Sequence, residues 1–156
     1  MADTFRLGKD AKVYRSTSGN YLAPTWVEID IIKDVALKCD AGEWDGSRRG
    51  SGGWKQMART MKSAEIDLDM VFVPNDAGYL AIRNAYIGGA LLDLLVLTGS
   101  IAVDNNEGLR AEMTVLSLER EEKLEEGIMI KSKVKPGVSA NAPVWVATLA
   151  SAIIVI

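Results

Sequence analysis

Two runs of alternating apolar and polar residues flank a glycine-rich, charged segment, and this arrangement limits the possible folds more than any other feature. The runs are Ile32 to Cys39 and Met57 to Phe72, and Asp40 to Gly53 lies between them. A period of two is typical of strands that bury one face. The pattern therefore predicts one long antiparallel hairpin with a protruding polar tip.

The same alternation predicts which side chains share a face of this hairpin. The apolar positions are Val35, Leu37 and Cys39 in the first run and Ile66, Leu68, Met70 and Phe72 in the second. The opposite face of the second run carries the carboxylates Glu65, Asp67 and Asp69. Because Cys39 occupies an apolar strand position and is the only cysteine, we expect a buried, inert thiol there.

Carboxylates at every second residue could hold a cation or act as an acid–base pair. The chain has no histidine, and it has no second carboxylate cluster of matching spacing. A solvated face is therefore favoured for Glu65, Asp67 and Asp69. If that face lines a channel, its negative charge would repel a polyanion and let it slide.

The tip between the two runs combines glycines with Arg48 and Arg49, and Trp44 and Trp54 stand at its margins. Glycine amides and arginines can cradle a phosphate, but no phosphate-loop or dinucleotide pattern opens a helix here. The segment returns into a strand instead. We therefore favour a loop that contacts another subunit over an anion site or a merely solvated loop.

The overall composition favours a single domain that spans residues 1–156. The chain is 48% hydrophobic and carries a formal charge of −3. The absence of histidine excludes Ser-His-Asp and Cys-His catalysis. We therefore expect no enzyme activity, no catalytic residue, no cofactor and no metal ligand.

The remaining elements follow the chain in order. Residues 1–10 form an N-terminal arm, and one helix follows Pro74. Strands are expected at 11–15, 109–118 and 128–134, and at 91–103 with a break or a bend at the turn over residues 98–100. Asn75 or Asp76 caps the helix and Gly88 and Gly89 end it. The predicted fold is mainly β, a sandwich or barrel with one flanking α-helix and the long protruding hairpin.

The apolar run from Ala142 to Ile156 is too short for a membrane helix, which needs about 20 residues. Its Val, Ile and Thr content favours a C-terminal strand over 144–156. An exposed apolar strand at a chain end invites pairing with another chain. We expect that the protein is synthesised in the cytoplasm and does not insert into a membrane.

Three stretches resemble a known family. They are GKDAKVYR, then TWVEIDIIKDVALKCDAGEWDGSRRGSGGWKQMARTMKSAEIDLDMVF with the DAGYLAIRNAY helix, and finally GLRAEMTVLSLEREEKLEEGIMIKSKVKPGVSANAPVW. Together they resemble the tail tube proteins of bacteriophages and phage-like particles, which are similar in fold to the tube protein of type VI secretion. The closing ASAIIVI does not belong to this pattern.

The resemblance implies a homohexamer whose rings stack into a helical tube of a virion tail, through which DNA is ejected. It implies contacts between subunits at the arm, the 40–53 loop with Trp44, Arg48, Arg49 and Trp54, and the C-terminal strand. Glu65, Asp67 and Asp69 become candidates for the lumen. Tape-measure, tail-terminator and baseplate proteins are the implied partners, and DNA touches the lumen only transiently and without specificity.

Two alternatives stay open at this point. The first keeps self-assembly but places the tube in a contractile injection device or a cellular filament. The second is a small binding enzyme or a ligand-carrying β-barrel, in which the acidic row or the arginine loop serves a small molecule.

Overall fold

The computed structural model describes residues 5–156, so the first four residues of the expected arm lie outside the described residues. The long elements are β3 (Ile32–Asp45), β4 (Met57–Val71), α1 (Ala77–Gly88), β6 (Glu107–Glu121) and β7 (Met129–Pro136). The shorter strands are β1 (Lys12–Ser16), β2 (Trp26–Glu28), β5 (Leu92–Leu97), β8 (Val144–Leu149) and β9 (Ala152–Val155). Two short 3-10 turns, Gly8–Asp10 and Arg49–Ser51, complete the described chain.

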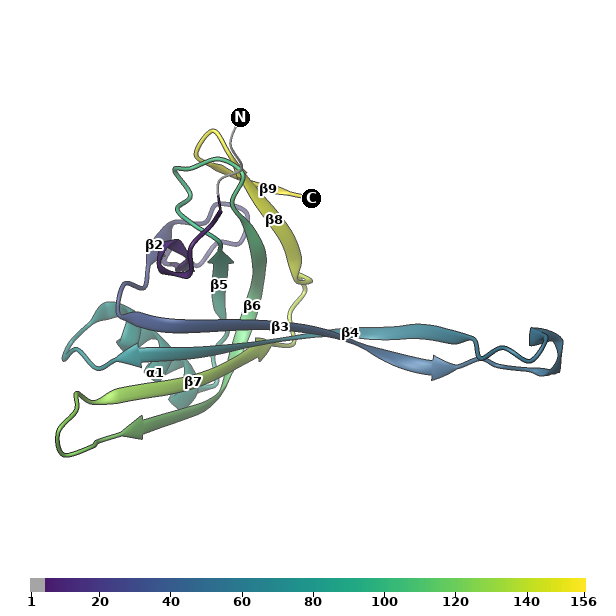
Figure 1. The fold of residues 1–156 in the computed structure, drawn as a ribbon. Helices are drawn as coiled ribbons and strands as arrows, with labels where there is room; N and C mark the ends of the chain where they lie inside the picture. Colours follow the sequence, from purple (N-terminus) through teal and green to yellow (C-terminus); the bar gives the residue numbers. More distant parts are fainter. Residues whose placement is uncertain (1–4) are drawn as a thin grey trace.

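All strand pairs are antiparallel and belong to one nine-stranded sheet with the order β2-β1-β5-β6-β7-β4-β3. The β8–β9 hairpin lies off this path and joins it through β6. The structure thereby confirms the expected mainly β fold with a single helix. Figure 1 shows the β3–β4 hairpin leaving the body as a long ribbon.

Strand β6 bends the sheet, because its two halves have different partners. Residues 108–113 pair with β5 and residues 107–110 pair with β8, whereas residues 113–121 pair with β7. A register shift between Val115 and Ser117 marks a bulge in this strand. Bulges increase local twist and bend a strand, which lets β6 belong to both parts of the sheet.

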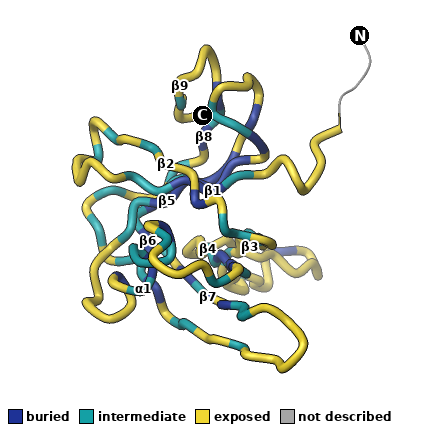
Figure 2. The backbone as a smooth tube through the Cα atoms, turned by 90° about the vertical axis from the view of Figure 1, so that its left-hand side faces the viewer, coloured by how far each residue is buried: buried dark blue, intermediate teal, exposed yellow. Residues whose placement is uncertain are grey.

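The core fills the concave side of this bent sheet. Its fully buried side chains include Ile66 and Leu68 from β4, Met113 from β6 and Val134 from β7. Ile82 of α1 completes this core and is also fully buried. Figure 2 shows buried backbone concentrated in the central strands, while the loops are exposed.

Helix α1 forms as the sequence predicts and for the predicted reasons. Asp76 accepts a hydrogen bond from the amide of Tyr79 at 3.1 Å and so caps the first turn. The helix ends at Gly89, whose φ of 69° is the left-handed conformation that glycine adopts without strain. The Tyr79 ring also meets Phe72 edge to face, with centroids 5.2 Å apart.

A second apolar cluster lies on the other side of β1 and β5 and is covered by the β8–β9 hairpin. Tyr14, Leu95, Leu97 and Val146 are its buried members. Nearby, the fully buried Asn106 donates hydrogen bonds to the carbonyls of Ser100 and Val103 and accepts one from Thr98. These bonds hold the 98–106 loop together, and the amide of Asn106 donates to the hydroxyl of Thr148 on β8 at 3.1 Å.

Several predicted boundaries differ from the structure. Strand β3 continues to Asp45 instead of ending at Cys39, so the tip is shorter than the expected 40–53 segment. The C-terminal 144–156 segment is a hairpin of two strands, because residues Ala150 and Ser151 make a turn. Strand β5 ends at Leu97, directly before the 98–100 turn at which the sequence predicts a break or a bend. Among the described residues, no helix is long and apolar enough to span a membrane.

Candidate assembly and lumen surfaces

The outer part of the β3–β4 hairpin, residues 39–64, stands clear of the body and is called the ribbon below. Its strands pair from Cys39 and Ala64 to Asp45 and Met57, with a register shift between Ala41 and Glu43. Most of its side chains are exposed. A two-stranded ribbon is at best marginally stable alone, so its rigidity depends on its own tip and on the body at its base.

The tip closes on itself through side-chain hydrogen bonds. Ser51 is buried there, and its hydroxyl donates to Gln56 at 3.2 Å and accepts from the amide of Arg48 at 3.0 Å. The amide of Gln56 in turn donates to Ser47 at 2.8 Å. Hydrogen bonds from Ser47 also lower the pKa of the Asp45 carboxyl.

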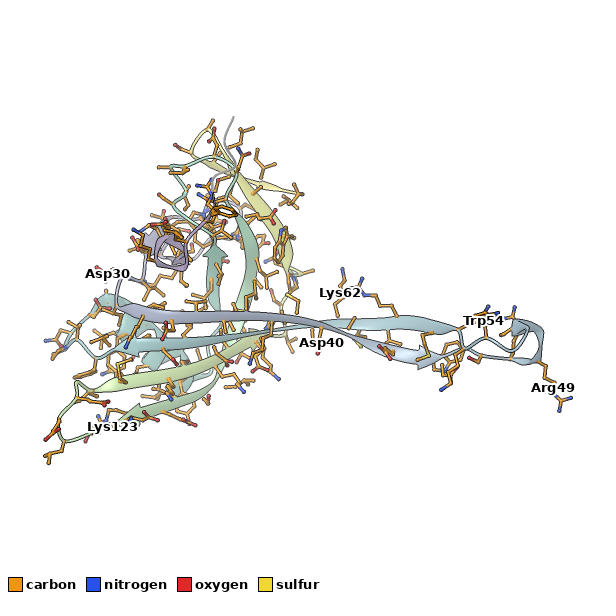
Figure 3. The ribbon with its side chains drawn as sticks, viewed as in Figure 1. Asp30, Asp40, Arg49, Trp54, Lys62 and Lys123 are labelled. Carbon is orange, nitrogen blue, oxygen red and sulfur yellow. The ribbon has the colours of Figure 1, made fainter. Side chains whose placement is uncertain are left out.

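The four residues predicted to contact other subunits all lie at this end of the ribbon. Trp44 is 63% exposed and Trp54 is 78% exposed, and both arginines are exposed as well. Figure 3 shows Arg49 pointing outward from the far end of the ribbon, and Trp54 lies further back in the same end region. Exposed tryptophans beside arginines have the composition of contact sites between proteins.

Cys39 is exposed, which corrects the expectation of a buried thiol. The alternation itself is confirmed, because Val35 and Leu37 on the same face pack against the core. Cys39, however, lies where β3 has already left the body, opposite Ala64. An apolar strand position is buried only where another layer covers it.

The face of the sheet opposite the core is polar and carries the predicted carboxylate row. We call this surface the polar face; it comprises the outward residues of the body parts of β3, β4, β7 and β6. Its charged members are Asp34, Lys38, Glu65, Asp67, Asp69, Glu119, Glu121, Lys131, Lys133 and Lys135. Glu65, Asp67 and Asp69 are half-buried and share it, as the alternation predicts.

The carboxylate row does not stand alone, because lysines from the neighbouring strands reach it. Glu65 accepts from Lys133 at 2.9 Å and lies 3.5 Å from Lys135. Asp67 pairs with Lys38 at 3.0 Å. The hydrogen bond between Glu65 and Lys133 lowers the pKa of the carboxyl and raises the pKa of the amine. Most of the charged side chains on the polar face therefore form ion pairs with each other.

Several strand edges of the described chain have no partner. No described strand pairs with the outer edge of β3, and β6 has no partner beyond Met113 on the edge that pairs with β5. Unpaired edges are templates for another strand. A groove of about 640 Å³ runs between the start of β3 and β1, and it is lined by Lys12, Val13, Lys33 and Val35 among others.

The apolar end of the chain also faces solvent. Trp145 and Leu149 of β8 are 39% and 52% exposed, and Val155 and Ile156 are 62% and 69% exposed. At the other end of the described chain, Phe5 is 85% exposed, and Arg6 donates to the carbonyl of Asp104 at 3.1 Å. Both ends of the described chain lie towards the upper end of the body in Figure 1.

No protein-family model matches the sequence, and no curated protein matches it significantly. Solved structures do match the fold. The chain is 16% identical to the tail of an empty gene transfer agent particle solved with C6 symmetry, with a TM-score of 0.70 over 86% of this chain and 96% of that chain. It is 14% identical to the SPP1 tail tube, with a TM-score of 0.66 over 83% of this chain and 74% of that one.

The chain has a tail tube fold. A likeness of lower score, with a TM-score of 0.55 and 11% identity, extends to a sheath–tube complex of an extracellular contractile injection system and covers 88% of both chains. The tail tube fold therefore includes proteins from particles of different kinds. The resemblance seen in the sequence is thereby confirmed for the fold.

Sequence reasoning missed the lysines of β7 as members of the candidate site. The alternation of IMIKSKVK places Lys131, Lys133 and Lys135 on one face of a strand. That signal predicts which lysines share a side, but it does not predict that this side adjoins the carboxylates of β4. The pairing of Asp67 with Lys133 joins segments 66 residues apart and depends on the sheet order.

Proposed function

We propose that this protein is the structural subunit of a phage-like tail tube, in which copies close into rings and rings stack around a hollow lumen. The supporting observation is the tail tube fold combined with an unpaired edge on each side of one sheet. The ribbon is a second surface that the subunit leaves uncovered. The role is structural, and no bond is made or broken.

The sheet order favours closure by copies of the same chain. Strands β3, β4, β7 and the far half of β6 form a four-stranded, antiparallel unit whose outer edges are the free ones. The unit has an even number of antiparallel strands, so its two outer strands, β3 and β6, run in opposite directions. When copies in the same orientation form a ring, β6 of one copy therefore lies antiparallel to β3 of the next, and every junction is equivalent. The C6 symmetry of the similar gene transfer agent tail favours six copies.

In such a ring the polar face lines the lumen. The opposite face of the four-stranded unit is covered by the subunit's own core and helix α1. The bodies must lie outside a closed barrel, because its interior cannot hold them. The polar face is then the inner wall, and Glu65, Asp67 and Asp69 belong to that wall.

The ribbon runs along the direction of the lumen-lining strands and reaches past the body (Figure 1). It therefore extends towards a neighbouring copy or the next ring. Trp44, Arg48, Arg49 and Trp54 are the contacts we assign to it. The described part of the arm, from Phe5, and the 144–156 hairpin supply the other contacts between subunits.

The setting that best fits these features is the tail of a phage or gene transfer agent, assembled in the host cytoplasm. DNA would pass through the lumen. A tail needs proteins that set its length and close its ends, which are the tape-measure, tail-terminator and baseplate proteins. A tube inside a contractile injection device is the alternative setting, and a neighbouring gene for a sheath would favour it.

Negative-stain microscopy of the purified protein tests the proposal. We expect rings or tubes with a central channel as the protein concentration rises, and a matching shift to large species in size-exclusion chromatography. A subunit that stays monomeric at every concentration, with a saturable site for a small molecule, would favour the ligand-binding barrel and refute the tube.

A further inference from the structure

The polar face contains a straight row of cations that the proposed function does not use. Lys131, Lys133 and Lys135 alternate along β7 with the buried residues Ile130, Ser132 and Val134. Side chains two residues apart on a strand are separated by about 6.7 Å. Phosphates of one DNA strand follow each other at about 3.4 Å along the helix axis. Because successive phosphates also turn around this axis, their separation in space is larger than the rise, and the lysine spacing is comparable to that of neighbouring phosphates of one strand.

Each lysine of this row already has a carboxylate partner within the subunit. Lys133 and Lys135 share Glu65, at 2.9 and 3.5 Å, and Lys131 lies 3.3 Å from Glu121. The partners come from the strands on both sides, Glu65 from β4 and Glu121 from β6. Carboxylates outnumber lysines on the polar face by six to four, which leaves a small net negative charge.

These ion pairs are partly exposed and therefore weak. The lysine side chains of the row are 45–47% exposed, and the carboxylate side chains are 24% and 43% exposed. Exposed ion pairs contribute about 0–1 kcal/mol, so a lysine can leave its carboxylate for another anion at little cost. A phosphate that approaches the row must nevertheless compete with a carboxylate held at the same position.

We infer that the polar face is a masked contact surface for a phosphodiester polyanion, with Lys131, Lys133 and Lys135 as the contacts and Glu65 and Glu121 as the internal competitors. The lysines prevent outright repulsion and the carboxylates prevent retention, so the polyanion is touched but not held. This inference rests on the proposed function for its setting, the lumen. The face itself is solvent-exposed in the isolated subunit.

The isolated subunit therefore suffices for the test. Binding of a short fluorescent DNA duplex is measured by anisotropy at about 50 mM salt, where phosphate contacts are strong. The wild type should bind weakly. The double variant Glu65→Gln/Glu121→Gln releases all three lysines, and we expect its affinity to rise at least about tenfold. Raising the salt to about 200 mM should abolish the gain, with a log–log slope near −3 for three phosphate contacts.

Two control proteins separate this effect from a change in net charge. Asp30→Asn/Glu125→Gln removes the same two charges at exposed positions outside the polar face, where neither residue forms an ion pair among the described residues, and should leave the affinity unchanged. Adding Lys131→Gln, Lys133→Gln and Lys135→Gln to the first variant should remove its gain. Circular dichroism checks that every variant is folded.

An equal rise in affinity in both double variants would overturn the inference, because net charge alone would then explain it. No rise in either would also overturn it. Tube formation is scored separately by microscopy. A gain in affinity without tubes would support the surface and refute the tube, whereas tubes without the gain would refute the masked surface alone.

Discussion

The guanidinium of Arg110 on β6 forms a double hydrogen bond with the carboxylate of Asp93 on β5, at 2.7 and 3.2 Å. The same guanidinium lies 3.8 Å from the ring centroid of Tyr21 and 4.9 Å from that of Trp26. It also donates to the carbonyl of Tyr21 at 2.7 Å. One side chain thereby holds the 17–25 loop against the sheet.

This arrangement predicts a large loss of stability when Arg110 is removed. Both charged side chains are only 12–13% exposed, so Arg110→Ala leaves a poorly solvated carboxylate without its partner. We expect the free energy of unfolding to fall by about 3 kcal/mol in urea denaturation. Arg120→Ala removes an arginine whose ion pair with Glu122 is exposed and should cost less than about 0.5 kcal/mol. Equal losses in the two variants would contradict this prediction.

The hydrogen bonds of Glu112 predict that the stability of the fold decreases in acid. Its carboxylate accepts hydrogen bonds from Ser139 and Asn141, at 2.7 and 2.9 Å, and these bonds lower its pKa. A lowered folded-state pKa adds stability above the ordinary glutamate value of about 4.3, and the gain is lost as the pH falls through the folded-state pKa. Glu112→Gln should therefore be less stable than the wild type near neutral pH, and the difference should vanish in acid. A difference that does not depend on pH would contradict it.

Shortening the ribbon should separate folding from assembly. Asp40 and Ser63 are paired, so residues 41–62 can be replaced by Asn-Gly, which favours a two-residue hairpin turn. The core lies outside the removed segment, and we expect nearly the same midpoint of thermal unfolding but no tubes. Trp44→Ser/Trp54→Ser keeps the ribbon and should weaken assembly less severely. Normal tubes from the shortened chain would show that the ribbon is not an assembly contact.

The backbone of the turn between β8 and β9 is strained, and substitutions can relieve this strain. Ala150 and Ser151 have φ values of 52° and 62°, a left-handed conformation that is unfavourable for both residues. Ala150→Asn/Ser151→Gly supplies residues that favour such turns, and we expect a gain of roughly 1 kcal/mol in urea denaturation. Ala140→Asn, at an exposed position with negative φ, is the matched control and should change nothing measurable.

The exposed position of Cys39 predicts its reactivity towards Ellman's reagent. In the folded subunit the thiol should react completely without denaturant. Assembly that covers the base of the ribbon should slow the reaction. A thiol that reacts only after unfolding would show that Cys39 is buried after all.

Local patterns in the sequence were sufficient to predict the hairpin and the helix. Alternation placed Ile66, Leu68 and Met70 on the buried face, and Asp76 and Gly89 bounded α1, because both signals act between near neighbours. The exposed positions of Trp44 and Trp54 also agree with their prediction as part of a protruding tip. Whether these residues contact other copies is tested by the shortened ribbon and by the Trp44→Ser/Trp54→Ser variant.

Features that depend on distant pairing were not predictable in this way. The exposure of Cys39 depends on where the body ends beneath β3. The ion pairs between Glu65 and the lysines of β7 depend on the order of strands in the sheet. The clamp of Arg110 on Tyr21 joins residues 89 positions apart. None of these relationships leaves a periodic trace in the sequence.

The pairing of the strands has a consequence for the order of folding. The β3–β4 hairpin closes across a short turn, whereas β1 pairs with β5 only after about 80 residues, as Tyr14 with Leu95. Local pairings form sooner than distant ones, so we expect the β3–β4 hairpin with its ribbon to be complete before the core from which it extends. Its open edge is then available to other newly made chains early. Premature association competes with core closure, and charged residues such as Lys38 and Asp40 along that edge are what delay it.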